Sequence, residues 1–159
     1  MSEHLKTHVQ IGEVKIGHAG QVLNAILGSC IGLGFLYPTK GIFGLAHCLL
    51  SQSTKVTDEI GGRNVDQAIY SLQSLMDISK LDYRKIQVIV TGGANMTMPK
   101  DTDPSRLVGS INSRYAYKTV RELGIRNIHE DVGGFLGRQV SIDCSTGEFL
   151  ITPIPRLGN

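Results

Sequence analysis

Four short apolar segments, separated by glycine, serine or proline, fill the first third of the chain. They are too short for ordinary helices and are typical of buried β-strands. The segment Pro38-Thr39-Lys40-Gly41 is typical of a hairpin turn between the last two. This part is therefore expected to be β-structure, with strands at residues 9–16, 21–27, 31–37 and 42–50.

Two helices are expected further along the chain. Apolar residues recur every three or four positions from Val65 to Met76, and Asn64 precedes them as a potential N-cap. A second helix is expected at residues 112–123, before Gly124. Further strands are expected at residues 85–91, 138–144 and 148–152.

The pattern predicts a single domain of the α+β class over residues 1–159. We expect a layered α/β fold with mixed β-sheets and two main helices. Residues 1–8 are expected to be a frayed N-terminus.

Composition narrows the function classes. The 159 residues are 41% hydrophobic and 19% charged, as in ordinary globular domains. The net charge of +2, with no basic run, argues against a nucleic-acid partner. The longest nearly apolar stretch, residues 26–37, is too short to cross a bilayer, so no membrane insertion is expected. Because the N-terminus lacks the apolar core of a secretory signal, a cytoplasmic location is expected.

Three cysteines, an odd number, suggest reduced thiols rather than a disulfide framework. Cys30 lies among small residues, which leave room beside the sulfur and let backbone N–H groups approach a bound carbonyl. If the hairpin has a two-residue loop, Cys30 lies opposite His47; with a four-residue loop the two are diagonal neighbours on the same face. Either loop brings thiol and imidazole together, whereas a one-residue bulge would separate them.

An imidazolium beside a thiol lowers the thiol pKa and prepares a nucleophile. The alternative is structural, with Cys30 as a buried small hydrophobe and His47 as a core histidine. Cys48 and Cys144 are interpreted as structural, because Cys48 points to the opposite sheet face from its neighbour His47 and no histidine is expected beside Cys144.

No metal site and no cofactor are expected. His129-Glu130-Asp131 is ligand-like but lacks a second histidine or cysteine nearby. The segment Thr91-Gly-Gly-Ala-Asn95 follows a strand, but it lacks the dinucleotide pattern and the lysine of a phosphate loop. Tight packing is the favoured role of its glycines.

Several motifs occur in a specific order along the chain. They are Leu27-Gly-Ser-Cys30-Ile-Gly-Leu, Gly44-Leu-Ala-His47, Thr91-Gly-Gly-Ala-Asn-Met96, Val108-Gly-Ser-Ile-Asn112, and Glu130-Asp-Val-Gly-Gly134 followed by Gly137-Arg138. With them the chain resembles the chemoreceptor glutamine deamidase family, CheD, from about residue 11 to residue 151. The resemblance implies a layered fold related to the cysteine-dependent deamidase toxins.

The resemblance also implies a function. Cys30 would be the nucleophile and His47 its partner in a protein-glutamine glutaminase, which hydrolyses glutamine side chains of methyl-accepting chemotaxis receptors to glutamate through a thioester. Backbone N–H groups near Gly28 and Ser29 would hold the oxyanion. The implied partners are the cytoplasmic helices of chemoreceptors and a CheC-type phosphatase.

One position departs from the family. Where the family has a threonine six residues before the cysteine, this chain has Asn24. An amide oxygen can accept a hydrogen bond from an imidazole N–H, so Asn24 is the predicted third catalytic residue. The alternative is a catalytically weak or inert adaptor that binds chemoreceptors or a CheC-type phosphatase.

Overall fold

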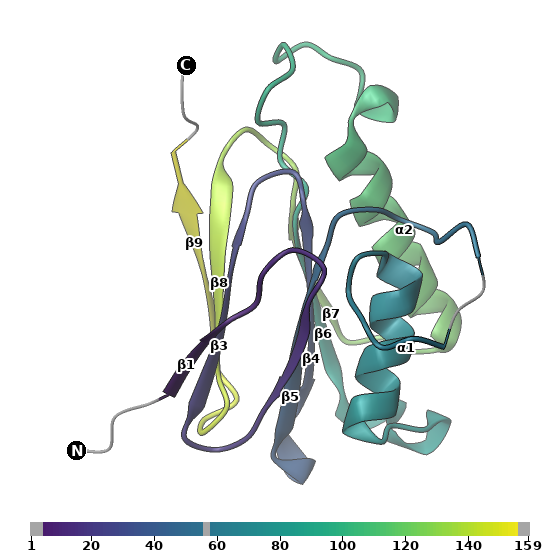
Figure 1. Ribbon diagram of the computed structural model, residues 1–159, viewed down its shortest axis with the longest axis vertical. Coiled ribbons are helices and arrows are strands. Elements are labelled where there is room, and N and C mark those ends of the chain that lie inside the picture. The colour runs from purple at the N-terminus through teal and green to yellow at the C-terminus, as the bar shows by residue number, and fades with distance from the viewer. Residues whose placement is uncertain (1–4, 56–57, 156–159) are drawn as a thin grey trace.

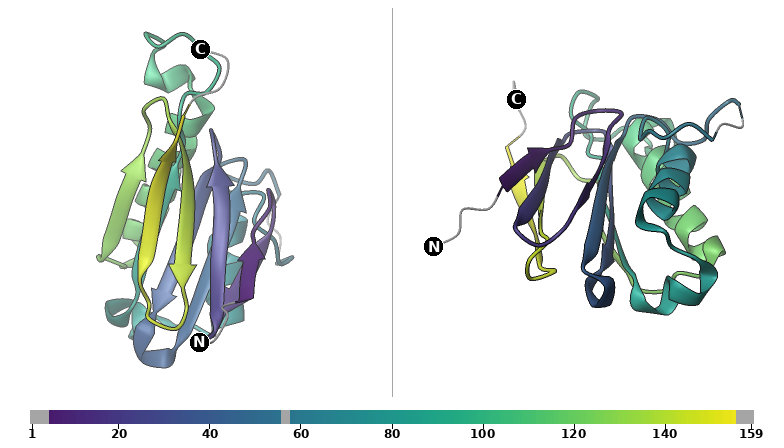
Figure 2. Two further views of the ribbon diagram at one scale, coloured as in Figure 1. Left: turned by 90° about the vertical axis from the view of Figure 1, so that its left-hand side faces the viewer. Right: turned by 60° about the horizontal axis from the view of Figure 1, so that its bottom comes forward.

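The computed structural model describes residues 5–55 and 58–155. Two β-sheets lie face to face, and two helices pack on the outer side of one of them (Figure 1). No helix of the described residues covers the outer face of the other sheet, as the turned views show (Figure 2). The expected α+β class with mixed sheets and two main helices is confirmed.

The two helices of the described residues are α1 (Val65–Met76) and α2 (Val108–Leu123), and short 3₁₀ turns form at Pro38–Lys40, Lys80–Lys85 and Pro104–Arg106. The described strands are β1 (Leu5–His8), β2 (Val14–Gly17), β3 (Gln21–Leu27), β4 (Ile31–Tyr37), β5 (Ile42–Cys48), β6 (Gln87–Gly92), β7 (Ile128–Val132), β8 (Gly137–Asp143) and β9 (Phe149–Ile154).

The four-stranded sheet has the order β1-β3-β8-β9, and the five-stranded sheet has the order β2-β5-β4-β6-β7. Each sheet contains one parallel pair, β1 with β3 and β6 with β7. The other neighbouring strands run antiparallel.

Alternation along the strands of the five-stranded sheet divides its side chains between two cores. Ile31, Leu33 and Phe35 of β4 face the helices. Phe43 and Leu45 of β5 face the four-stranded sheet. A residue's position in its strand therefore decides whether it lies beneath the helices or between the sheets.

The N-terminal expectation is wrong for the residues that the structure describes. Leu5–His8 form β1, parallel to β3, and the N–H of Leu5 donates to the carbonyl of Gly20 (2.9 Å). The strand expected at residues 9–16 is interrupted at Gly12, whose φ of +87° favours glycine and starts a turn. Residues 9–13, called the Val9 turn below, carry the chain from one sheet to the other.

The second helix begins four residues earlier than expected, at Val108. Asn112, the expected first residue of this helix, therefore lies inside α2, where its side-chain amide donates to the carbonyl of Leu49 (2.8 Å). Asn64 holds the N-cap position of α1 without a side-chain cap hydrogen bond. No helix in the described residues is long and apolar enough to cross a membrane.

Candidate functional site

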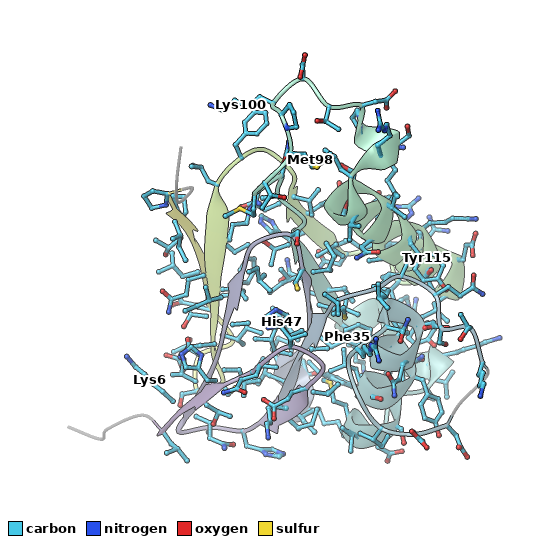
Figure 3. All side chains as sticks on the ribbon, turned by 45° about the horizontal axis from the view of Figure 1, so that its top comes forward. Lys6, Phe35, His47, Met98, Lys100 and Tyr115 are labelled. Atoms are coloured by element: carbon cyan, nitrogen blue, oxygen red, sulfur yellow. The ribbon has the colours of Figure 1, made fainter. Side chains whose placement is uncertain are left out.

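The hairpin of β4 and β5 brings Cys30 and His47 together. Gly32 pairs with His47, and residues 38–41 form a four-residue loop. Cys30, two residues before Gly32, is therefore a diagonal neighbour of His47 on the same face, as expected for the longer loop. Cys30 belongs to the core between the two sheets, and His47 lies between them in Figure 3. The register and the shared face predicted for the four-residue loop are confirmed.

Residues 28–30, called the Cys30 turn below, are held by the end of β6. The N–H of Gly93 donates to the carbonyl of Cys30 (2.9 Å), and that of Ala94 donates to the carbonyl of Gly28 (3.0 Å). In the part of the chain that the structure describes, the backbone N–H groups of Ser29 and Cys30 take part in no hydrogen bond. Two donors are thus available beside the sulfur.

Gly92 is required for this contact. Its φ is +99°, and a Cβ atom there would lie 2.2 Å from the carbonyl oxygen of Cys30. A similar close approach joins β6 to α2, because a Cβ atom on Gly109 would lie 2.4 Å from the carbonyl oxygen of Gly93. Gly92 at the end of β6 and Gly93 after it therefore serve tight packing, as the sequence favoured.

The Val9 turn orients His47. The imidazole Nδ1 lies 3.0 Å from the carbonyl oxygen of Val9. Because a carbonyl only accepts, Nδ1 carries the proton and Nε2 is left unprotonated in the neutral ring. The backbone of His47 also binds this turn, accepting from Gly12 (2.8 Å) and donating to Glu13 (3.1 Å).

Burial sets the protonation of the pair. Cys30 is 8% exposed and His47 is 5% exposed. Burial raises the pKa of the Cys30 thiol. It also lowers the pKa of His47, which the hydrogen bond to Val9 opposes. The expected lowering of the thiol pKa is therefore wrong for the free protein, because desolvation disfavours both charged forms. The pair rests as thiol and neutral imidazole.

Asn24 does not bind His47 in the described structure. Leu23 and Ala25 face the core between the sheets, so the side chain of Asn24 points to the opposite face of β3. There its Oδ1 accepts a hydrogen bond from the hydroxyl of Ser141. Strand alternation explains why the expected hydrogen bond is not formed.

Asn24 is nevertheless linked to the site through its backbone. Its carbonyl accepts from the N–H of Val9 (2.7 Å), whose own carbonyl holds His47. A part for Asn24 in the reaction stays a prediction.

One cavity borders His47, and another borders Ser29, the residue before Cys30. One, of about 440 Å³, is lined by His8, Val9, Gln10, Ile11, Ile26 and His47. The other, of about 300 Å³, is lined by Ser29 together with residues 94–98 and 106–109. Ile11 and Ile26 are 57% and 55% exposed, so the first cavity has an apolar rim.

The remaining candidate residues lie elsewhere. Cys48 faces the helices, and burial raises its pKa. Burial likewise raises the pKa of Cys144, to about 11. The ring of His129 packs on Phe149 with 5.0 Å between centroids. The described residues contain no group of three or more histidine, cysteine or acidic side chains that could hold a metal ion.

One partner of His47 was not predicted. The carbonyl of Val9, which binds Nδ1 of His47, belongs to the backbone, so no pattern of side chains could predict it.

Fold and site define a layered α+β protein with a buried cysteine–histidine pair between two mixed sheets. The chain belongs to the CheD family: a family model described as "CheD chemotactic sensory transduction" matches residues 49–153.

Curated relatives are similar in sequence over nearly the whole chain. A protein of Ruegeria sp. (strain TM1040), named probable chemoreceptor glutamine deamidase CheD 2, is 52% identical over 95% of this chain and 93% of its own length. A protein of Archaeoglobus fulgidus, named probable chemoreceptor glutamine deamidase CheD, is 33% identical over 90% of each chain. Among solved structures, YlmD from Geobacillus stearothermophilus matches with a TM-score of 0.45 and 17% identity, over 75% of this chain and 49% of that one.

Proposed function

We propose that this protein is a glutamine deamidase that hydrolyses side-chain amides of chemoreceptors to glutamate and ammonia. The family membership and the names of the relatives support the substrate class. The observation that carries the chemistry is the diagonal placement of Cys30 and His47 on one face of the β4–β5 hairpin.

The first half of the proposed reaction forms a thioester. As the Cys30 sulfur attacks the carboxamide carbon, its proton passes to Nε2 of His47, which rests neutral. The backbone N–H groups of Ser29 and Cys30 donate to the oxyanion that develops. The imidazolium then gives the proton to the departing nitrogen, and ammonia leaves as the C–N bond breaks.

The second half releases glutamate. His47 takes a proton from water, which attacks the thioester carbon, and the C–S bond breaks. The proton returns to sulfur, which restores the thiol. The carbonyl of Val9 stabilises the transient imidazolium through the Nδ1 hydrogen bond.

The surroundings of the pair suggest how a receptor approaches. The exposed Ile11 and Ile26 at the cavity that contains His47 would contact apolar residues beside the target glutamine. We propose the cytoplasmic helices of chemoreceptors as substrate, and hence a cytoplasmic site of action. A CheC-type phosphatase is proposed as a partner on the family resemblance alone.

The proposed function is tested by mass spectrometry on a purified cytoplasmic receptor fragment incubated with the protein in ¹⁸O-labelled water. We expect specific glutamines to become glutamates that carry one label in the new carboxyl group. A fragment whose glutamines remain amides under these conditions contradicts the proposal, and receptor binding without conversion would favour the adaptor alternative.

A further inference from the structure

Arg138 links the two sheets next to the Cys30 turn. It belongs to β8 of the four-stranded sheet, and its side chain reaches Asp131 on β7 of the other sheet, with 3.2 Å between Nε and Oδ1. The side chain of Arg138 is 12% exposed, whereas that of Asp131 is 44% exposed. The guanidinium is therefore the buried partner, and the carboxylate keeps contact with water.

The same guanidinium holds a backbone carbonyl of β6. Nη1 of Arg138 donates to the carbonyl of Gly92 (3.2 Å) and, over a longer distance, to that of Leu136 (3.4 Å). The Gly92 carbonyl also accepts from the N–H of Gly133 (3.0 Å). The peptide between Gly92 and Gly93 is thus held at its carbonyl by the side chain of Arg138 and the backbone of Gly133.

The N–H of that same peptide belongs to Gly93, and it donates to the carbonyl of Cys30. One peptide plane therefore has its oxygen bound by Arg138 and its N–H bound to the residue that carries the sulfur. Because peptide planes are rigid, a tilt at the oxygen moves the N–H as well. The geometry connects the guanidinium to the Cys30 turn through a single peptide.

We propose that Arg138 is a positioning residue for the reaction at Cys30, acting through the Gly92–Gly93 peptide, with Asp131 fixing the direction of its guanidinium. The inference rests on the proposed function. A planar guanidinium can bind a carboxylate and a carbonyl at once, which the single ammonium of lysine matches poorly. Loss of this support displaces the backbone N–H groups that would hold the oxyanion.

The kinetic test compares Arg138→Met and Arg138→Lys with the wild type, and Arg126→Met, at an exposed arginine, is the control. We expect Arg138→Met to lower kcat about tenfold to a hundredfold with KM changed less than twofold, since small misplacement of reacting groups has effects of this size. Arg138→Lys should recover only part of the loss. An unchanged kcat in Arg138→Met overturns the proposal.

Chemical rescue separates positioning from general damage to the fold. In Arg138→Ala, added guanidinium chloride at tens of millimolar should restore part of kcat, and sodium chloride at the same ionic strength should not. A structural defect would give no such selectivity. Equal effects of the two salts overturn the positioning role.

Amide hydrogen exchange supplies a readout that needs no turnover. In Arg138→Met the N–H of Gly93 should exchange at least tenfold faster than in wild type, while that of Ala68 inside α1 should not change. Unchanged exchange at Gly93 overturns the inference. If wild type shows no deamidation, the proposed function fails, and the exchange rates still decide whether Arg138 holds this peptide.

Discussion

Replacing Gly92 with alanine adds a methyl group where β6 touches the Cys30 turn. The methyl carbon would lie 2.2 Å from the carbonyl oxygen of Cys30 at a φ of +99°. Gly20 is a matched control, because its φ is +92° and nothing lies within 4 Å of the corresponding position. The two substitutions share the backbone strain and differ in the contact with Cys30.

The magnitudes follow from these contacts. A side chain at positive φ costs about 1 to 2 kcal/mol, which is the whole effect expected for Gly20→Ala. In Gly92→Ala the carbonyl of Cys30 must also move by about 1 Å to relieve the contact. This movement breaks its hydrogen bond with Gly93, which adds about 1 kcal/mol.

The two variants also separate stability from activity. A displacement of about 1 Å at the nucleophile should lower the deamidation rate by roughly a hundredfold in Gly92→Ala, and Gly20→Ala should keep the wild-type rate. The assays are urea unfolding and single-turnover deamidation of a receptor fragment. Equal losses of stability in the two variants, with unchanged rates in both, would refute the reasoning.

Three further predictions concern the site. Because the pKa of His47 is lowered, its neutral form should persist in acid, so kcat/KM should fall only below pH 6.5. Because the pKa of Cys30 is raised, the rate of its alkylation should keep rising above pH 9.0. An alkylation rate that is already constant at neutral pH would contradict this protonation state. Asn24→Ala should lower turnover by less than tenfold, because the carbonyl of Val9 holds His47, whereas a loss of about a hundredfold or more would support the catalytic triad predicted from sequence. Ile26→Asp should raise KM for the receptor fragment about tenfold at constant kcat. Leu150→Asp, an exposed control on the same sheet, should leave KM unchanged. Equal KM values in the two variants would show that Ile26 does not contact the receptor.

Local patterns predicted much of the fold. The strands at residues 21–27 and 31–37 and the helix from Val65 to Met76 have the expected bounds, because each combines a clear apolar period with a turn or cap signal at its ends. β7 was missed, since Ile128–Val132 places three polar residues between its two apolar ends. It forms through its parallel pairing with β6, which no local pattern reveals.

The candidate site was also predictable only in part. The proximity of Cys30 and His47 followed from the parity of one hairpin, a short-range property. The group that orients His47 could not be predicted in this way, because the Val9 turn lies outside the hairpin and contributes a backbone carbonyl. Alternation along β3 could have predicted that the side chain of Asn24 faces away from His47, because its neighbours Leu23 and Ala25 are apolar and face the core between the sheets. The protonation of the pair required the burial of both groups, which only the assembled sheets provide.

Single-turnover deamidation by Cys30→Ala, beside Cys48→Ala, tests the central claim most directly. Both cysteines are buried and lie at the same end of the β4–β5 hairpin, but only Cys30 shares a face with His47. We predict that Cys30→Ala forms no glutamate while its urea unfolding remains cooperative, and that Cys48→Ala retains turnover. Glutamate formation by folded Cys30→Ala at the wild-type rate would contradict the assignment of Cys30 as the nucleophile.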